Sequence, residues 1–240
     1  MNIDALIKSL LRKLGIDIRE YIVSRSDAAR MLKLFKHYRI DSVLDVGANQ
    51  GQYASYLRAI GYCGKITCFE PLKEPHSKLL KFAERNKNII VAPPMALGDQ
   101  IGEITINISE NSLSSSILPM LDIHTQVAEG SAYISSEVVK LERLDALDNS
   151  YFSDSNGIFL KIDAQGYESQ ILEGASGVLQ QIKGIQLEMS LVPLYAGELI
   201  YQEMINKIES LGYTLHDINP SFADSKTGRT YQVDGIFFRN

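Results

Sequence analysis

Acidic side chains that follow short apolar segments are the residues best suited to chemistry in this sequence. Asp45 lies directly before a glycine-containing turn, and Glu70 and Asp163 each end an apolar run. A carboxylate at the end of a strand, about 20 residues past such a turn, accepts hydrogen bonds from ribose hydroxyls. A carboxylate can also take the proton of a reacting hydroxyl as a general base. The sequence therefore offers candidates for nucleoside binding and for proton transfer.

The turn after Asp45 joins a predicted buried strand to a helix expected over Tyr53–Ile60. The segment from Ser42 to Tyr53 reads S-V-L-D-V-G-A-N-Q-G-Q-Y. Glycine lets the backbone turn sharply and approach a ligand closely, and the start of a helix offers free N–H groups and a partial positive charge. We therefore expect a nucleotide-type site, to which this segment contributes Asp45, Gly47, Ala48, Asn49, Gly51, Gln52 and Tyr53.

The spacing within this turn narrows the choice of nucleotide. Counted from Gly47, Asn49 and Gln52 occupy the second and third glycine positions of the dinucleotide fingerprint. A pyrophosphate needs a bare backbone beneath it, and the Gly-Lys-Ser/Thr of a P-loop is also missing. The remaining pattern, D-x-G-x-N-x-G, resembles motif I of the class I methyltransferases that use S-adenosylmethionine (SAM). Asp45 could face the SAM ammonium group directly or through water, and a tight turn without a ligand is the alternative.

Two further segments are expected at the same edge of the sheet, because the carboxyl ends of the strands meet there in a doubly wound fold. A strand predicted over Lys65–Phe69 ends at Glu70, since Pro71 lacks an N–H and stops it. The loop after a strand predicted over Asn88–Val91 could flank an adenine. The cofactor-binding residues expected from these two segments are Glu70, Pro71, Ala96, Leu97 and Gly98.

Length, composition and charge favour a single globular domain. The 240 residues are 45% hydrophobic and 22% charged, and we predict a single domain over 1–240. The formal net charge of −5 gives no electrostatic reason to expect nucleic acid as a partner. Cys63 and Cys68 make no disulfide framework or zinc pattern. Without a signal peptide or an apolar run of membrane-spanning length, the expected compartment is the reducing cytoplasm.

Two segments fall outside the regular alternation of strands and helices. Residues 1–40 are predicted to be helical, and their first helix is amphipathic and partly basic. We expect that helix to pack on the domain or on a second copy of the chain, with a membrane surface as the alternative. Residues 111–137 are Ser-rich and lack clear periodicity, which is typical of functional or disordered segments. We interpret them as a lid or acceptor-binding insertion, and a mobile surface loop is the alternative.

The run Ile158–Ile162 is apolar enough for a strand buried on both faces, which we expect beside the first strand. Asp163 would then lie across the switch point of the sheet from Gly47. The other predicted strands are Glu103–Ile108, Glu137–Leu141, Gly184–Glu188, Tyr213–Asp217 and Gln232–Arg239, and the other predicted helices are Ser26–Tyr38, Pro75–Asn86 and Glu198–Leu211.

A set of motifs in this order resembles the FkbM-type SAM-dependent methyltransferases, from about Ser42 to Phe238. The motifs are V-L-D-V-G-A-N-Q-G-Q-Y, F-E-P, A-L-G-D, L-K-I-D-A-Q-G-Y-E and Q-L-E-M-S. The resemblance implies an α/β, Rossmann-like class I methyltransferase fold, with a mostly parallel seven-stranded sheet, helices on both faces and an antiparallel last strand. It also implies SAM as cofactor and O-methylation of a hydroxyl on a sugar, glycan or natural product. Ala164 and Gln165 depart from the common hydrophobic–acidic pair after Asp163.

Transfer of a methyl group to a hydroxyl requires in-line alignment of the reacting atoms and a group that removes the proton. Asp163, Glu188 and His124 are the candidates for this base, and His216 is a weaker one. Asp163 and Glu188 could instead hold a divalent cation, but two carboxylates without a third ligand lead us to predict no metal site. An NAD- or nucleotide-sugar-binding oxidoreductase and a non-catalytic SAM-fold binding module are the alternative functions.

Overall fold

A seven-stranded sheet forms the centre of the protein, which the computed structural model describes over residues 3–18, 20–152 and 155–239. The strands lie in the order β3-β2-β1-β7-β8-β10-β9. Their bounds are β1 Ser42–Val46, β2 Lys65–Phe69, β3 Ile89–Val91, β7 Ile158–Ile162, β8 Ile182–Ser190, β9 Thr214–Ala223 and β10 Thr230–Phe238. The pairs from β3 to β8 are parallel, whereas β10 runs antiparallel to both β8 and β9. The predicted α/β fold with an antiparallel last strand is confirmed.

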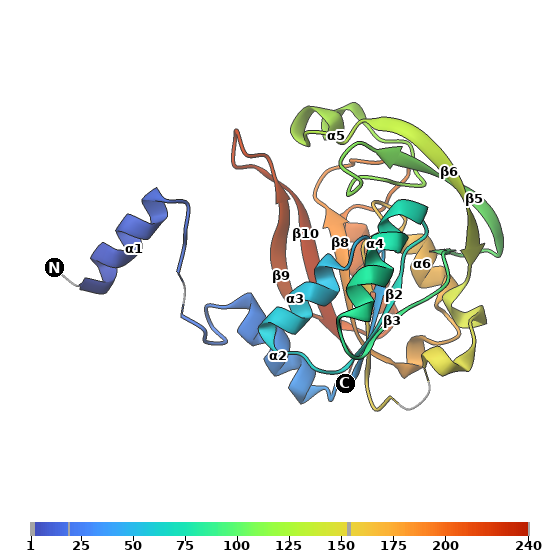
Figure 1. The fold of residues 1–240 in the computed structure, drawn as a ribbon, viewed down its shortest axis with the longest axis horizontal. Coiled ribbons are helices and arrows are strands. Elements are labelled where there is room, and N and C mark those ends of the chain that lie inside the picture. Colours follow the sequence, from blue (N-terminus) through green and yellow to red (C-terminus); the bar gives the residue numbers. More distant parts are fainter. Residues whose placement is uncertain (1–2, 19, 153–154, 240) are drawn as a thin grey trace.

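Helices cover both faces of this sheet (Figure 1). The helices α2 (Asp27–His37), α3 (Gln52–Ile60) and α4 (Lys73–Glu84) pack on one face, and α6 (Glu168–Gly174) and α7 (Tyr201–Ser210) pack on the other. Successive side chains of a strand point to opposite faces. Along β1, Val43 accordingly belongs to the core under α2–α4, whereas Leu44 and Val46 belong to the core under α6 and α7.

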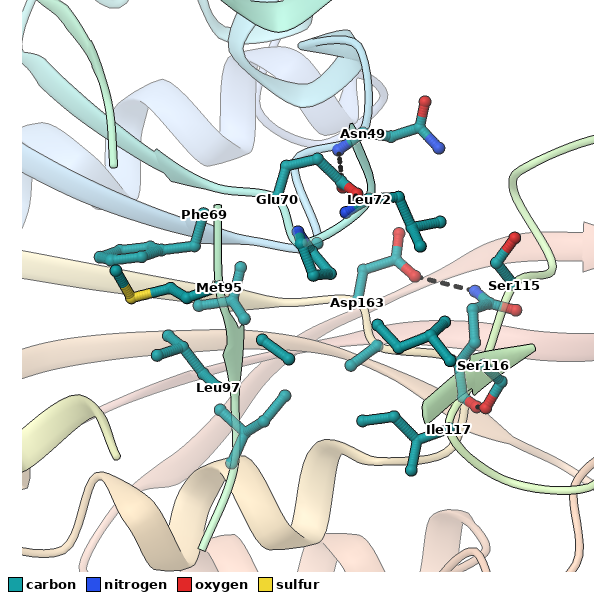
Figure 2. Close-up of a pocket in the computed structure, with 18 of the residues that line it drawn as sticks. Asn49, Phe69, Glu70, Leu72, Met95, Leu97, Ser115, Ser116, Ile117 and Asp163 are labelled. Carbon is teal, nitrogen blue, oxygen red and sulfur yellow. Dashed lines mark hydrogen bonds between the residues drawn. The ribbon is translucent and has the colours of Figure 1, made fainter. Parts of the chain in front are cut away.

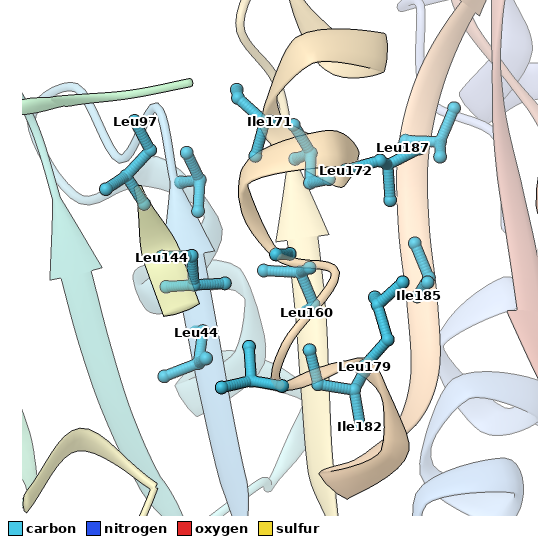
Figure 3. Close-up of a cluster of buried hydrophobic side chains, with 14 of the residues drawn as sticks. Leu44, Leu97, Leu144, Leu160, Ile171, Leu172, Leu179, Ile182, Ile185 and Leu187 are labelled. Carbon is cyan, nitrogen blue, oxygen red and sulfur yellow. The ribbon is translucent and has the colours of Figure 1, made fainter. Parts of the chain in front are cut away.

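The larger core explains the apolar sequence of β7 (Figure 3). Leu44, Leu160 and Ile185 from three adjacent strands are fully buried against Ile171 and Leu172 of α6. Phe159, on the opposite face of β7, is also fully buried in the core of α2–α4. A strand that is covered on both faces needs this near-continuous apolar sequence. The predicted position of β7 beside β1 is confirmed by the parallel register of the two strands.

A second, three-stranded sheet lies beside the first one, in the order β4-β6-β5. Its strands are β4 Ala96–Leu97, β5 Gly102–Ser109 and β6 Tyr133–Glu142. Figure 1 shows β5 and β6 as a curved pair that carries the chain up to the short helix α5 (Asp122–Val127) and back. Strand β6 begins four residues before the predicted start at Glu137, because its pairing with β5 continues to Tyr133. The irregular part of 111–137 thus ends where β6 begins.

Helix α5 is held against the C-terminal half of the chain. The backbone N–H of Leu121 donates to the carbonyl of Leu194 at 2.9 Å, and Met120 forms an isolated bridge with Tyr195. Apolar side chains of α5 and of the segment before it pack with Leu194, Tyr195 and Tyr231. The segment before α5 is tied down as well, since the Asn111 side chain accepts the backbone N–H groups of residues 113 and 114. Residues 111–132 are therefore ordered, and we call this segment the cover.

Two element boundaries near the C-terminus differ from the prediction for identifiable reasons. Helix α7 begins at Tyr201 rather than Glu198, because the Glu198 carboxylate accepts the backbone N–H groups of Leu194 and Tyr195 and closes a turn. Strand β9 extends six residues past the predicted end at Asp217, because it pairs along its length with β10. The resulting hairpin reaches α5, with Phe222 in the same apolar cluster.

The N-terminal helix α1 (Ile3–Lys13) lies apart from the sheet and its covering helices (Figure 1). Its apolar side chains Ile7 and Leu10 are exposed, as is Leu14 directly after the helix. The structure thus does not place this helix on the domain, and packing against a second copy stays a prediction. None of the helices within the described ranges is long and apolar enough to cross a membrane.

The ends of β1 and β7 pack closely against each other at Gly47, the residue directly after β1. The backbone N–H of Asp163 donates to the carbonyl of Val46 at 3.1 Å. A Cβ atom on Gly47 would lie only 1.9 Å from the backbone oxygen of Asp163. Gly47 also has a left-handed φ of +76°, which favours glycine. No side chain can be accommodated here without moving one of the two strands.

We predict that Gly47→Ala lowers the free energy of unfolding by about 3 kcal/mol or more, from the backbone penalty together with the overpacking. Chemical denaturation measures this change. The matched control is Gly228→Ala, because Gly228 has nearly the same φ of +75° but no atom within 4 Å of the added Cβ. The control should lose only about 1 kcal/mol. Equal losses in the two variants would contradict the packing argument.

Candidate functional site

The turn after β1 is held by the carboxylate of Glu70. The backbone N–H of Asn49 donates to one Glu70 oxygen at 2.8 Å, and the backbone N–H of Leu72 donates to the other at 2.9 Å. The two N–H groups from Gly47 and Ala48 donate to the Phe69 carbonyl. Strand β2 therefore fixes the turn through its last residue and through the acidic side chain that follows it.

Glu70 is also the principal polar group on one wall of a cavity. Burial raises the pKa of its carboxyl to about 7, although the N–H groups of Leu72 and Asn49 favour the charged form. Each carboxylate oxygen can accept a second hydrogen bond. A ligand with two neighbouring hydroxyls would supply the missing donors and stabilise the carboxylate. The predicted ribose contact of Glu70 agrees with this arrangement and stays a prediction.

The cavity beside Glu70, which we call the β2–β4 cavity, is apolar over most of its wall (Figure 2). Phe69, Met95 and Leu97 lie together at one end, and Asp163 lies toward the segment with Ser115 and Ser116. A buried carboxylate with free acceptor sites beside an apolar slot is what the ribose and base of a nucleoside require. The residues present thus fit the SAM that the sequence predicts.

The predicted cofactor residues divide between two cavities. Gly47, Asn49, Glu70, Pro71, Ala96 and Leu97 line the β2–β4 cavity. Ala48, Gln52 and Tyr53 line a neighbouring cavity next to α3, here called the α3 cavity, which shares Gly47 and Asn49. Gly51 and Gly98 are among the lining residues of neither cavity. Gly51 is instead packed under Phe82 at the start of α3, and Gly98 lies against Tyr167.

Asp45 is fully buried beneath the turn and forms an ion pair with Lys161. Their closest atoms are 3.2 Å apart, and Lys161 also lies 3.4 Å from Asp163. Burial disfavours the ammonium group, but the charges of Asp45 and Asp163 outweigh this effect and raise the pKa of Lys161. The ammonium group lies 5.3 Å from the ring centroid of Tyr53. The structure gives Asp45 this partner, and its predicted contact with the SAM ammonium group stays a prediction.

Asp163 lies where three cavities meet. It lines the β2–β4 cavity, the α3 cavity and a third, larger opening between α5 and the β9–β10 hairpin, here called the α5 cavity. Its side chain is 38% exposed, in contrast to the buried Asp45. The other residue that lines all three is Leu113, from the predicted lid. A ligand in the β2–β4 cavity and one in the α5 cavity could therefore meet at this carboxylate.

The turn from β7 into α6 is capped by Glu168 and not by Asp163. The Oε1 of Glu168 accepts the backbone N–H groups of Ala164 and Gly166 at 2.9 and 3.2 Å. The Asp163 carboxylate instead accepts hydrogen bonds from the side chains of Lys161 and Gln165. Glu168 thus holds the turn, and Asp163 is left open to the cavities.

His124 and Glu188 both line the α5 cavity. His124 is 2% exposed, with its ring perpendicular to that of Tyr195 and its Nδ1 unpaired among the described residues. Burial lowers the pKa of His124 to about 4, so the imidazole is neutral at pH 7 and a weak base. Burial, together with the charges of Asp163 and Asp234, raises the pKa of Glu188 well above its ordinary value.

The weaker base candidate, His216, does not reach the site. Its ring nitrogens lie 2.8 Å from the Tyr38 hydroxyl and 2.7 Å from the Thr214 carbonyl. It lines none of the three cavities that Asp163 lines. Within the described ranges, no three His, Cys, Asp or Glu side chains gather in a group that could hold a metal ion.

Several residues of the site carry no sequence signal of their own. Ser112, Ser115, Ser116 and Ile117 of the predicted lid line the β2–β4 cavity, so this segment reaches the cavity that is predicted for the cofactor. Gln165 connects Asp163 with Glu188. Apolar wall residues such as Met95 and Ile106 look like ordinary core residues in a sequence. Met95 could have been predicted as a site residue only from its position in the loop after β3.

Comparison with known proteins gives a family match over most of the chain. Residues 45–215 match the model of the methyltransferase FkbM domain. No match is found among curated protein sequences.

Solved structures resemble this chain at low sequence identity and with TM-scores below 0.5. A SAM-dependent methyltransferase from Aquifex aeolicus is 15% identical, with 97% of this chain and 98% of that chain covered and a TM-score of 0.45. The methyltransferase domain of bacterial CtHen1-C is 10% identical, with 89% and 96% covered and a TM-score of 0.49. TehB from Haemophilus influenzae is 11% identical, with 88% of this chain but only 62% of that chain covered and a TM-score of 0.45.

We predict that SAM binds more weakly as the pH falls from 8 to 6, because ribose hydroxyls donate to the charged form of Glu70. The carboxyl has a pKa of about 7 without ligand, so protonation removes the preferred acceptor within this range. Isothermal calorimetry at a series of pH values measures the affinity. Glu70→Gln should bind SAM about 10-fold or more weakly, as the loss of one charge-assisted hydrogen bond implies, and with less dependence on pH.

The control for this experiment is Glu74→Gln, an exposed glutamate in the first turn of α4. It should bind SAM with wild-type affinity and wild-type pH dependence. An unchanged SAM affinity in folded Glu70→Gln would remove Glu70 from the cofactor site.

Proposed function

Because the chain belongs to the FkbM methyltransferase family and is a SAM-dependent methyltransferase, we propose that it transfers the methyl group to a hydroxyl oxygen of a sugar, glycan or other polar small molecule. The observation that carries this proposal is the position of the Asp163 carboxylate at the junction of the β2–β4 and α5 cavities. The family match sets aside the NAD-dependent and nucleotide-sugar oxidoreductase alternatives.

The lining of the α5 cavity supports a hydroxylated acceptor. Polar side chains predominate on its wall and come from the lid, from β8 and from the hairpin of β9 and β10; they include Asn111, Ser114, Thr125, Gln126, Glu188, Asp224, Lys226 and Gln232. Groups of this kind recognise hydroxyls through hydrogen bonds in both directions. An apolar acceptor would leave these groups without partners, which is costly in a binding site.

In the proposed mechanism Glu70 binds the ribose hydroxyls and the apolar wall around Met95 and Leu97 takes the adenine. Bound SAM supplies an electrophilic methyl group on a sulfonium. The acceptor hydroxyl would lie in the α5 cavity beside Asp163, whose carboxylate would take its proton as the carbon–oxygen bond forms and the bond between the methyl carbon and sulfur breaks. The products are a methyl ether, the neutral thioether S-adenosylhomocysteine and a protonated Asp163. A negative charge at this position also favours the cationic cofactor over its neutral product.

His124 is the second candidate for the base, and its environment differs from that of Asp163. Its imidazole is neutral and buried, with the unpaired Nδ1 able to accept a hydrogen bond. The Nδ1 atom is buried, whereas the Asp163 side chain is 38% exposed and lines both the β2–β4 and the α5 cavity. We therefore assign removal of the acceptor proton to Asp163.

Asp163→Asn should reduce kcat by about 10²–10⁴-fold, because it keeps the shape of the side chain but removes the base. SAM affinity should change by less than about 10-fold, since one surface-accessible charge contributes little to binding. The assay measures methyl transfer from radiolabelled SAM to a panel of p-nitrophenyl glycosides. The control is Asp148→Asn, which lies outside the cavities at the start of the turn Asn149–Tyr151. Wild-type turnover in folded Asp163→Asn would refute its role as the base.

The cover formed by residues 111–132 should respond to ligands in two stages. S-adenosylhomocysteine alone should slow amide hydrogen exchange in residues 112–117, which line the β2–β4 cavity. Exchange in α5 should slow only when a glycoside that serves as acceptor is also present. Hydrogen-exchange mass spectrometry distinguishes the two stages, and unchanged exchange in both segments would favour a cover that does not take part in binding.

A further inference from the structure

The side chain of Gln165 occupies the space between two acidic groups of the site. Its backbone has a left-handed φ of +53°, which is uncommon for a residue other than glycine. The backbone carbonyl of Gln165 accepts a hydrogen bond from the Ser116 hydroxyl at 2.6 Å. The turn after β7 and the cover over the site are thus joined at this residue, which brings its side chain back toward Asp163.

The Gln165 amide nitrogen donates to both carboxylates. It lies 2.8 Å from Oδ1 of Asp163 and 3.0 Å from Oε2 of Glu188. An amide NH₂ group has two hydrogens, so each carboxylate receives one. Two carboxylates this close would repel each other without a donor between them. The amide therefore gives Asp163 and Glu188 a shared partner.

Tyr195 determines which way the amide points. Its hydroxyl lies 2.7 Å from Oε1 of Gln165, and the side chain is fully buried. A hydroxyl that donates to the amide oxygen keeps this oxygen on the tyrosine side and the nitrogen on the carboxylate side. The reversed amide would face two carboxylates with its carbonyl oxygen and would lose both of its donor contacts.

Glu188 has further neighbours that define its electrostatic environment. Gln232 Nε2 donates to Oε2 at 2.7 Å, and the Ser221 hydroxyl donates to Oε1 at 2.9 Å. The charges that act on it come from Asp163 after β7, Asp234 on β10 and Glu168 on α6. His124 of α5 and Lys226 of the hairpin face the same cavity. Burial and the nearby negative charges raise the pKa of Glu188, so its titration reports on the distance to Asp163.

We propose that Gln165 is a positioning residue of the methyl-transfer site, whose amide, oriented by Tyr195, holds the Asp163 and Glu188 carboxyl groups together and directs Asp163 toward the acceptor. This inference rests on the proposed role of Asp163 as the base. Gln165 donates hydrogen bonds at this place, whereas an acidic side chain would add a third negative charge.

The test measures how strongly Asp163 and Glu188 influence each other with and without the amide. The titration midpoint of Glu188 is followed by carbon NMR of the ¹³C-labelled carboxyl, in the full-length protein without acceptor, with Glu188→Gln for assignment. Four proteins are compared, namely wild type, Asp163→Asn, Gln165→Met and the double variant. Asp163→Asn should lower the Glu188 midpoint, because it removes a neighbouring negative charge. In the Gln165→Met background this lowering should shrink to less than half.

Tyr195→Phe should cause a smaller loss of the same coupling, since the amide remains but is no longer oriented. The matched control is Gln202→Met on α7, where the glutamine is exposed, and this variant should leave the coupling unchanged. A glutamine that only supports the fold would alter thermal stability and not the coupling. An equal lowering in both backgrounds, or no lowering in either, would overturn the proposal.

This result can be separated from the outcome for the proposed function. If the coupling shrinks as expected but Asp163→Asn retains wild-type turnover, Gln165 positions the pair and Asp163 is not the base. If Asp163→Asn loses turnover but the coupling persists in Gln165→Met, the base assignment stands and the positioning role of Gln165 is wrong.

Discussion

The close packing of Gly47 against the backbone carbonyl of Asp163 is the contact on which the rest of the site depends. It sets the separation of β1 and β7 at the edge of the sheet, where a Cβ atom would lie 1.9 Å from that carbonyl. The turn that follows Gly47 presents the N–H of Asn49 to Glu70, and the strand that ends at Asp163 presents its carboxylate to the cavities. The cofactor turn and the proposed base are therefore fixed relative to each other by backbone atoms, without reliance on flexible side chains.

The acidic groups around this contact differ in how their negative charges are compensated. Asp45 is buried and paired with Lys161, whereas Glu70 has only backbone N–H partners and free acceptor sites toward the cavity. Glu188 accepts from three neutral side chains, and the Asp163 side chain is 38% exposed. Burial of carboxyl groups without full charge compensation destabilises the apo protein in its charged state. Binding of donors to Glu70 and of an acceptor hydroxyl at Asp163 would relieve part of that cost.

The sequence predicted the strands of the main sheet and the position of Asp163 well, because these depend on local patterns. The apolar run of β7 indicates burial on both faces. The glycine turn was expected to approach a ligand, whereas in the structure Gly47 packs against the backbone of Asp163. The sequence could not predict that 133–137 pair with β5, or that Glu198 closes a turn before α7, since both depend on contacts formed in three dimensions. The sequence also could not predict the positions of Gln165 and of the serines within 112–116 in the site, because their contacts form only when the fold brings distant segments together. The sequence placed Asp45 and Glu70 alike as cofactor residues, but only the structure distinguishes the ion-paired group from the open one.

A crystal structure with sinefungin would show whether cofactor and acceptor meet at Asp163. Sinefungin carries an amine where SAM carries its sulfonium methyl group. We expect the ribose to contact Glu70, the adenine to lie against Met95 and Leu97, and the amine to lie within about 3.5 Å of the Asp163 carboxylate, a hydrogen-bonding distance. An analogue bound elsewhere, or bound in this cavity with its amine directed away from Asp163, would show that methyl transfer does not take place at Asp163.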